Sequence, residues 1–453
     1  MDIAAIKQLI TDGKIEYVKV GAPDIEGVYR GKRVAAKFFL DSLADGFAQC
    51  DVLFGWDIAE NVLPNLKFSN WERGFADVVM KPDLDTFALV PWEEHVASCV
   101  CDVWSEHGDP VEISPRYLLQ NLVERARSMG FEPLAASELE FRFFRENQMS
   151  LREKDFGPNL TPLNPGMNCY AISQATADDQ LLGRIARMMR DHGIEIEGYN
   201  REHGAGMYEM NLKHATGLEA ADRAMLFRNG VKEICMQQGL TATFMAKVSD
   251  AEDGCSGHLH QSLWDVSGTN LFHDPQDEHR LSSLARHYAA GVLQTLPELC
   301  ALYAPTINSY KRYVAGSWAP TALTWGVETR TTALRAVPGS PRSTRLENRV
   351  PGADANPYLA MAASIAAGLH GIEQRLELPP PARGNAYALT ASEAPHLPRS
   401  LHEAVERLAS SAVARDYLGG PFVDHYLTMR RWEVDQYNRV VDQWQRERYM
   451  EMI

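Results

Sequence analysis

Four short stretches of the chain place charged or metal-binding side chains on every second residue, with apolar residues between them. They read Ser137-Glu138-Leu139-Glu140-Phe141, Met207-Tyr208-Glu209-Met210, Gly257-His258-Leu259-His260-Gln261-Ser262 and Arg345-Leu346-Glu347-Asn348-Arg349. Because side chains alternate between the two faces of a β-strand, each stretch would present its ionisable row on one face and bury the other. One such stretch could be a solvent-exposed strand face. Four of them, carrying carboxylates, imidazoles and guanidinium groups, indicate a site for a polyanion and metal ions.

Six residues in or near these stretches are candidate ligands of hard divalent cations. Oxygen-rich sites with one imidazole suit Mg²⁺ or Mn²⁺ better than zinc, which favours more His or Cys. Carboxylates buried at this density persist only if cations compensate them. The alternative for any single glutamate is an exposed strand residue or a surface ion pair. The candidates are Glu138, Glu140, Glu202, Glu209, His258 and Glu347.

His260 and Ser262 continue the face that carries His258. Either residue could contact a bound nucleotide, and packing or surface roles remain equally open for both. The segment 308–349 adds a cluster of arginines, whose guanidinium forks match carboxylate and phosphate oxygens and stay charged when desolvated. Beside metal-bound anions they indicate a phosphoryl-transfer centre, and the alternative is a structural ion-pair network. These arginines are Arg312, Arg330, Arg335, Arg342, Arg345 and Arg349.

The bulk composition is that of an ordinary soluble enzyme. The chain has 453 residues, 45% of them hydrophobic, and a net charge of −15, which argues against binding to nucleic acid or an anionic membrane. Its seven cysteines form no CxxC pair, a pattern that favours free thiols in a reducing compartment. The N-terminus has no signal-like segment, no apolar stretch approaches 18 residues, and no GxxxxGK[ST] loop is present. We therefore predict a cytoplasmic protein that is not a P-loop enzyme.

The elements that must position these residues can be placed along the chain. A short helix over 2–12 precedes a β-rich unit of about 100 residues, and Ser114-Pro115 is typical of a helix start. Helical periodicity recurs between the charged strands and after Asn356-Pro357, and helices follow from Ser400 onward. A Pro- and Ala-rich stretch over 378–398 is predicted to be a loop. The predicted helices cover 115–129, 176–193, 218–239, 280–299 and 357–376.

Long blocks around the charged residues resemble the glutamine synthetase family, in its bacterial type I branch, along nearly the whole chain. The strongest block runs from Pro305 to Gly316 and reads Pro-Thr-Ile-Asn-Ser-Tyr-Lys-Arg-Tyr-Val-Ala-Gly. Further blocks are Arg330-Thr-Thr-Ala-Leu-Arg335, Arg345-Leu-Glu-Asn-Arg349 and Ala355-Asn-Pro-Tyr-Leu359. The match is looser around His258, where valine follows Lys247 in place of the usual proline. Asp253 also stands where the family tends to carry asparagine beside the bound glutamate.

The resemblance implies an α+β fold in two domains. Residues 1–105 would form an N-terminal β-grasp domain, and residues 106–453 a catalytic domain with a curved antiparallel β-sheet funnel flanked by helices. The resemblance further implies a homo-oligomer, a dodecamer of two stacked hexameric rings, with active sites between neighbouring subunits. The substrates would be ATP, glutamate and a nitrogen nucleophile, with two to three Mg²⁺ or Mn²⁺ ions in each site.

The resemblance also implies roles for individual residues. Glu140, Glu202 and Glu209 would hold one metal ion, and Glu138, His258 and Glu347 would hold another. Glutamate would be bound by Arg312 and Arg349 with Glu140 and Gly254. Arg330 and Arg335 would face the transferring phosphate, and the nucleotide would contact His260, Ser262, Arg335 and Arg345. The catalytic residues would then be Arg312, Arg330 and Glu347.

Two positions depart from the ammonia-using members of the family. Those enzymes carry an aspartate on an N-terminal loop and a glutamate on a flap, whereas here Phe54 and Trp318 stand at these places. Misalignment by one or two residues is the alternative for the loop, because Asp57 lies close by. Loss of both carboxylates removes the groups that would attract ammonium and take up its proton.

We therefore predict a γ-glutamylamine synthetase, which joins glutamate to an organic amine through γ-glutamyl phosphate. Phe54, Trp56 and Trp318 would offer an apolar slot, which favours an arylamine. A small alkylamine, with Asp57 as a conceivable base, comes next, followed by a polyamine. The alternatives are an ammonia-using glutamine synthetase and, in another class, a catalytically inactive regulatory homologue.

Overall fold

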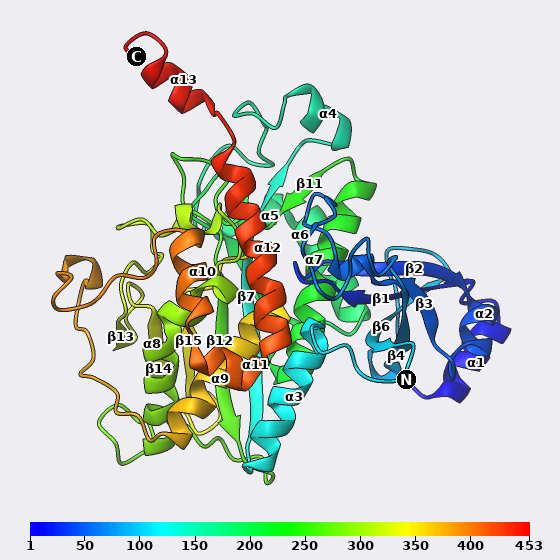
Figure 1. Cartoon of the computed structure of the whole chain (residues 1–453), viewed down its shortest axis with the longest axis horizontal. Helices are drawn as coiled ribbons and strands as arrows, with labels where there is room; N and C mark the ends of the chain where they lie inside the picture. The colour runs from blue at the N-terminus through cyan, green and yellow to red at the C-terminus, as the bar shows by residue number, and fades with distance from the viewer.

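The computed structural model describes residues 1–453 and contains two β-sheets (Figure 1). The N-terminal sheet has the order β2-β1-β6-β4-β3, with β5 paired to β6. β1 is antiparallel to β2 and parallel to β6, which makes the sheet mixed. Its strands are β1 (Tyr17–Pro23), β2 (Tyr29–Ala35), β3 (Phe47–Cys50), β4 (Asp77–Pro82), β5 (Ala88–Leu89) and β6 (Val96–Ser105).

The second sheet has nine strands and carries all four charged stretches. Its order is β13-β14-β15-β12-β7-β9-β8, with β10 and β11 both paired to β7. Every pairing is antiparallel except that of β13 with β14. The strands are β7 (Glu132–Phe144), β8 (Ile196–Arg201), β9 (Met207–Leu212), β10 (Ala215–Thr216), β11 (Thr241–Thr243), β12 (Gly257–Trp264), β13 (Trp325–Val327), β14 (Leu334–Val337) and β15 (Arg345–Asn348).

α2 packs against β1 and β2, α3 and α7 pack against β7, and two predicted helix starts are confirmed. Pro115 and Pro357 each begin a helix, and the side chain of Asn356 accepts a hydrogen bond from the Tyr358 amide. The helices are α1 (Ile3–Thr11), α2 (Ala36–Asp41), α3 (Pro115–Ser128), α4 (Gln148–Glu153), α5 (Ile172–Ala177), α6 (Asp179–Asp191), α7 (Gly217–Gln237), α8 (Ser283–Tyr303), α9 (Pro357–Glu373), α10 (Leu401–Ala409), α11 (Ala412–Leu418), α12 (Gly420–Asn438) and α13 (Gln443–Tyr449). The predicted α+β fold is therefore confirmed.

The N-terminal sheet is fixed to the rest of the chain through a shared core. One hydrophobic cluster contains residues of the N-terminal strands together with residues of α3, α8 and α9. The buried Arg116 of α3 donates hydrogen bonds to Asp83 and Asp102, which belong to the N-terminal part, and to Asp222 of α7. A buried guanidinium paired with several carboxylates holds its neighbours in one arrangement. The division into domains after residue 105 stays a prediction.

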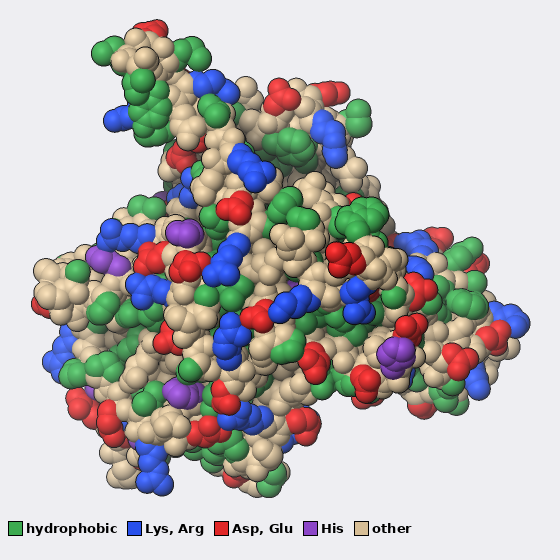
Figure 2. Space-filling view, viewed as in Figure 1, with side chains coloured by type: hydrophobic (Ala, Val, Ile, Leu, Met, Phe, Trp, Pro, Cys, Tyr) green, Lys and Arg blue, Asp and Glu red, His purple; other side chains and the backbone are tan.

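The surface carries mixed charge. Figure 2 shows acidic and basic side chains interspersed over the face in view, without a broad basic area. None of the helices is long and apolar enough to cross a membrane. The last helix, α13, projects from the body in Figure 1 and exposes Trp444 and Tyr449, and the residues that follow it expose Met450 and Ile453.

Candidate active site

The ionisable residues of the four stretches meet because their strands are neighbours in one sheet. β7 lies between β12 and β9, and this register pairs Glu138 with His258 and Glu140 with Glu209. β15 lies on the other side of β12 and pairs Glu347 with His260. Strand alternation then brings the ionisable rows to one face of the sheet, as the sequence predicted.

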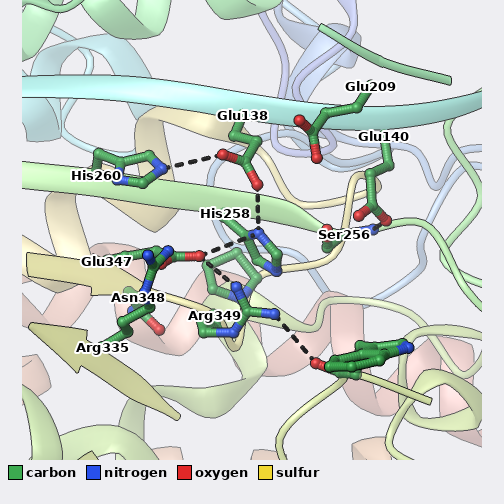
Figure 3. Close-up of polar contacts among 12 residues, drawn as sticks. Glu138, Glu140, Glu209, Ser256, His258, His260, Arg335, Glu347, Asn348 and Arg349 are labelled. Carbon is green, nitrogen blue, oxygen red and sulfur yellow. Dashed lines mark hydrogen bonds and ion pairs between the residues drawn. The ribbon is translucent and has the colours of Figure 1, made fainter. Parts of the chain in front are cut away.

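Glu138 lies between two imidazoles (Figure 3). His258 Nδ1 is 2.9 Å from one carboxylate oxygen of Glu138, and His260 Nε2 is 3.3 Å from the other. His258 Nδ1 also lies 3.4 Å from Glu347. Burial, together with the charge of Arg349, lowers the pKa of His258 to about 4. This imidazole is therefore neutral at pH 7, the form in which histidine binds metal ions.

The carboxylates of this group are held in their charged form. Burial alone would raise the pKa of Glu138, but hydrogen bonds with His258 and His260 hold it well below its usual range. Burial would also raise the pKa of Glu347, and the charges of Arg349 and His258 outweigh it and lower the value to about 2. Charged carboxylates beside a neutral imidazole form a suitable donor set for a divalent cation.

A second group consists of Glu140, Glu202 and Glu209, and no basic side chain forms an ion pair with any of them. Glu140 accepts a hydrogen bond from the Ser256 amide at 2.5 Å, and burial and the charge of Glu202 raise its pKa to about 7. Burial and the charges of Glu138 and Glu140 raise the pKa of Glu209 to about 9. A bound cation would relieve this repulsion.

The spacing of the candidate ligand atoms fits a divalent metal ion. Ligand atoms of Glu138, His260 and Glu347 all lie within 4.8 Å of one another. His260 is therefore as close to these carboxylates as a metal ligand would be, although the resemblance implied a nucleotide contact for it. Hard oxygen donors with imidazole favour Mg²⁺ or Mn²⁺.

Arginines anchor the carboxylate side of the cluster. Arg335 Nη1 donates to Glu347 at 2.8 Å, and Arg349 donates both to Glu347 and, at 3.2 Å, to the Trp318 carbonyl oxygen. The buried Arg312 donates to the carbonyl oxygen of Pro351 at 3.1 Å. The Nε groups of Arg312 and Arg349 are buried without a hydrogen-bond partner. Such unpartnered donors are rare in folded proteins and point to an anionic ligand.

A small cavity of about 50 Å³ lies beside this arginine pair. The predicted glutamate-binding residues line it together with the flap residue Trp318. Gly254 is required here, because a Cβ atom at this position would lie 2.4 Å from the Ala246 carbonyl oxygen and 2.6 Å from Arg312 Cγ. The residues that line this small cavity include Glu140, Glu202, His203, Asp253, Gly254, His258, Arg312, Trp318 and Arg349.

A larger cavity of about 500 Å³ opens on the other side of Glu138. Its lining includes Glu138 and three of the four predicted nucleotide contacts, His260, Ser262 and Arg345. The fourth, Arg335, does not line this cavity and pairs with Glu347 and Glu328. Arg345 Nε donates to His260 Nδ1 at 3.1 Å, which orients the imidazole. Cavities of this size accommodate drug-sized ligands. Glu138 and His258 therefore stand between a small cavity and a large one.

The chain does not bring every predicted site residue to this cluster. Phe54 is fully buried and packs edge-on against Phe68, and Arg30 stacks on Trp56 at 5.0 Å. Asp57 accepts hydrogen bonds from Asn61 and, at 3.0 Å, from Trp432 Nε1 of α12. Arg330 is exposed, with no hydrogen bond or ion pair. None of these four predicted residues lines the two cavities, and their roles stay predictions.

Two further contacts at the small cavity have no signal in the sequence. His203 Nδ1 lies 2.8 Å from Asp253 Oδ2, and both residues line the cavity. The hydroxyl of Tyr387, in the loop after α9, donates to the Ala319 carbonyl oxygen at 2.9 Å and so supports the flap. Trp318 itself has φ 61°, a left-handed conformation that is uncommon for a bulky residue.

Comparison with known proteins agrees with the fold and the site. The glutamine synthetase catalytic-domain family matches residues 112–449. The glutamate–isopropylamine ligase of a Pseudomonas species is 40% identical over 452 residues, which span 100% of this chain and 98% of that protein. The gamma-glutamylethanolamide synthetase GlnA4 of Streptomyces coelicolor is also 40% identical, spanning 100% and 96%. The chain therefore belongs to the glutamine synthetase family, as predicted.

Other relatives have different names. The type-1 glutamine synthetase 2 of Dictyostelium discoideum is 42% identical over 443 residues, which span 97% of this chain and 84% of that protein. A solved structure described as "Apo GmaS without ligand" superimposes with a TM-score of 0.85 at 28% identity, covering 99% of each chain. The chain thus shares its fold with this solved structure, and its similar relatives carry different enzyme names.

Proposed function

We propose that this protein is an ATP-dependent ligase that joins the γ-carboxylate of glutamate to an organic amine, giving a γ-glutamylamide. One observation carries the proposal: the flap carries Trp318 where ammonia-using members carry a glutamate. The carboxylates, histidines and arginines of the charged cluster are nevertheless retained. The ring of Trp318 is exposed at the cavity that holds Arg312 and Arg349. An apolar side chain there favours a nucleophile with a hydrocarbon part.

In the proposed mechanism, Arg312 and Arg349 bind and orient a carboxylate of glutamate. The γ-carboxylate oxygen of glutamate attacks the terminal phosphorus of ATP and displaces ADP, which gives γ-glutamyl phosphate. Arg335, fixed by Glu347, stabilises negative charge on the transferring phosphate. The amine nitrogen then attacks the acyl carbon, phosphate leaves, and the nitrogen loses a proton.

We further propose Mg²⁺ or Mn²⁺ as the metal. Glu140, Glu202 and Glu209 would hold one ion, and Glu138, His258 and Glu347 a second. Bound there, the ions would supply charge neutralisation to the phosphate and carboxylate oxygens. Support comes from the raised pKa of Glu209, about 9, which reflects burial and carboxylate repulsion that no basic side chain relieves.

The relatives' names favour a small alkylamine over the arylamine expected from the sequence. Proteins similar to this chain are named for isopropylamine, ethanolamide and methylamine. Phe54 also has no exposed surface to offer to an aromatic ring. We therefore propose an amine with a short aliphatic chain, with Trp318 packing against it.

The assembly remains a proposal as well. A dodecamer of two hexameric rings would place the N-terminal loop with Trp56 and Asp57 beside the site of a neighbouring subunit. The exposed apolar side chains of α13 are consistent with contacts between copies. Sedimentation of the purified protein tests this proposal, and a stable monomer that retains full turnover would contradict it.

ATP turnover with Mg²⁺ and glutamate tests the function across ammonium, isopropylamine, ethanolamine, aniline and putrescine. We expect a short alkylamine to give the highest kcat/KM and the matching γ-glutamylamide by mass. Ammonium as the best nucleophile would instead identify a glutamine synthetase, which the Dictyostelium relative's name favours. Putrescine as the best substrate would identify a polyamine ligase, and no ATP binding would indicate a regulatory homologue.

A further inference from the structure

We infer that Asp354 positions Arg312 for glutamate binding by holding the turn that leads into Arg312. Asp354 acts through the hydroxyl groups of Ser309 and Thr306. It lines neither of the two cavities, so it is a positioning residue and does not itself touch a substrate there. The inference rests on the proposed function, in which Arg312 and Arg349 bind a carboxylate of glutamate.

Asp354 is a partly buried carboxylate in the segment between β15 and α9. Its Oδ2 atom accepts a hydrogen bond from Ser309 Oγ at 2.6 Å and another from Thr306 Oγ1 at 3.0 Å. Its Oδ1 atom is buried and has no hydrogen-bond partner. Burial raises the pKa of Asp354, and the two hydrogen bonds and the charge of Arg312 oppose this rise. One carboxylate oxygen thus fixes two hydroxyl groups at once.

The same hydroxyl groups close the turn before Arg312. The Ser309 amide donates to Thr306 Oγ1 at 3.1 Å, and the Thr306 amide donates to Ser309 Oγ at 3.0 Å. The 3₁₀ helix η3 begins at Ser309 and ends at Arg312. A displacement of the Asp354 carboxylate would therefore be transmitted to the backbone of Arg312 over a single helical turn.

The guanidinium group of Arg312 is held by the segment that also carries Asp354. Its Nη2 atom donates to the carbonyl oxygens of Arg349 at 3.3 Å and Pro351 at 3.1 Å, and to that of Val350. This segment thus holds Arg312 at both ends, by backbone carbonyl groups at the guanidinium and by Asp354 at the turn. Arg312 is 2% exposed and its Nε has no partner, so its orientation towards an anionic ligand depends on these contacts.

Gly352 leaves room for the carboxylate of Asp354. A Cβ atom at residue 352 would lie 2.3 Å from Asp354 Oδ1. Because Oδ2 is held by two hydroxyl groups, the carboxylate cannot turn away without breaking their hydrogen bonds. Gly352→Ala should therefore displace the carboxylate and keep its charge.

Asp354→Ala tests the inference, because it removes the acceptor of both hydroxyl groups. We expect KM for glutamate to rise roughly tenfold, while kcat and the KM values for ATP and the amine stay within about twofold of wild type. Gly352→Ala should raise KM for glutamate in the same selective way. Asp354→Asn keeps an acceptor oxygen and should restore most of the glutamate affinity. An Asp354→Asn variant as impaired as Asp354→Ala would contradict a role through these hydrogen bonds.

Ser309→Ala and Ser411→Ala form a matched pair. Both serines are 1% exposed, and each donates to a carboxylate, Ser309 to Asp354 at 2.6 Å and Ser411 to Glu298 at 2.7 Å. Ser411 precedes α11 and lines neither cavity. Both substitutions should lower Tm by similar amounts, but only Ser309→Ala should raise KM for glutamate, by about threefold.

A double substitution tests whether the effect passes through Arg312. Arg312→Lys removes the guanidinium fork, so adding Ser309→Ala to it should raise KM for glutamate no further. Additive effects of the two substitutions would contradict a route through Arg312.

The other outcomes separate a positioning role from a structural one. Equal rises in the KM values for glutamate, ATP and the amine, or a lower Tm with an unchanged KM for glutamate, would overturn the inference. If Asp354→Ala does not fold, Ser309→Ala decides in the same way. If the wild-type protein prefers ammonium, the proposed function fails, but KM for glutamate measured with ammonium still tests Asp354.

Discussion

The buried charged cluster and the open end of the small cavity are built in different ways. The cluster stands on β7, β9, β12 and β15, whose register pairs His258 with Glu138 and Glu140 with Glu209. The open end consists of loops: the flap with Trp318 and the segments with His203 and Asp253. Paired strands fix side chains on a rigid surface, whereas loops can change without disturbing the sheet.

This difference assigns the reaction chemistry to the strands and the selection of the amine substrate to the loops. The strands carry the groups proposed to bind metal ions and phosphate, except Glu202, which directly follows β8. The flap loop carries Trp318, which is proposed to pack against the nitrogen nucleophile. Substitutions on the strands should therefore affect all amines alike, and substitutions on the loops should change their ranking.

Glu347→Gln should have the largest effect. Glu347 contacts Arg335, Arg349 and His258, so loss of its charge removes a proposed metal ligand and leaves Arg349 without a carboxylate partner, whereas Arg335 keeps its ion pair with Glu328. We expect kcat to fall roughly 10²- to 10³-fold with every amine. Thermal unfolding controls for loss of the fold. A fall in kcat with only one amine would contradict the view that the strand residues serve all amines alike.

Gly254→Ala should impair glutamate binding. The added Cβ atom would contact the Ala246 carbonyl oxygen and displace Arg312. Overpacking of this kind costs about 1–3 kcal/mol, so KM for glutamate should rise roughly 10- to 100-fold whichever amine is present. Gly420→Ala is the control, because a Cβ atom there meets only Arg415 at 3.9 Å. An unchanged KM for glutamate in Gly254→Ala would contradict a role of Gly254 in glutamate binding.

Trp318→Glu should change the ranking of amines. It restores a carboxylate on the flap, so kcat/KM for ammonium relative to isopropylamine should rise about tenfold. Trp318→Ala distinguishes loss of the ring from gain of the charge, and it should weaken isopropylamine without improving ammonium. If the ratio stays constant in Trp318→Glu, the flap does not select the amine.

The smallest expected effect is on stability. In the metal-free protein, burial and the charges of neighbouring carboxylates raise the pKa of Glu140 to about 7 and that of Glu209 to about 9. A raised carboxyl pKa means that metal-free stability falls as pH rises from about 4.5 towards these values. Mg²⁺ competes with those protons, so its stabilisation should grow between pH 6 and pH 8.5.

Differential scanning fluorimetry measures this effect as the Mg²⁺-induced change in Tm. We expect a gain of a few degrees that is larger at pH 8.5 than at pH 6. Glu209→Gln should reduce the gain and flatten its pH dependence. A gain that is equal at both pH values in the wild-type protein would argue against metal binding by these carboxylates.

Elements whose structure depends on local periodicity are predictable from the sequence. The alternation in Gly257–Ser262 predicted a strand with His258 and His260 on one face, and β12 confirms it. Proline at residues 115 and 357 predicted two helix starts that α3 and α9 confirm. These signals lie within a few residues of one another, so they need no knowledge of the tertiary fold.

Contacts between distant loops could not be predicted in the same way. His203 and Asp253 are separated by 50 residues, and Tyr387 reaches the flap from 68 residues away. Such pairs depend on how loops pack, for which the sequence has no periodic signal. The same limit applies to Trp56 and Asp57, whose proposed partners belong to a neighbouring subunit.

Competition between ammonium and isopropylamine within one reaction tests the nucleophile preference of the protein most directly. The protein is incubated with ATP, Mg²⁺, glutamate and equal concentrations of ammonium and isopropylamine, and the products are quantified by mass spectrometry. We expect an excess of γ-glutamylisopropylamide over glutamine. Glutamine as the main product would contradict it, because the flap tryptophan would then not have changed the nucleophile.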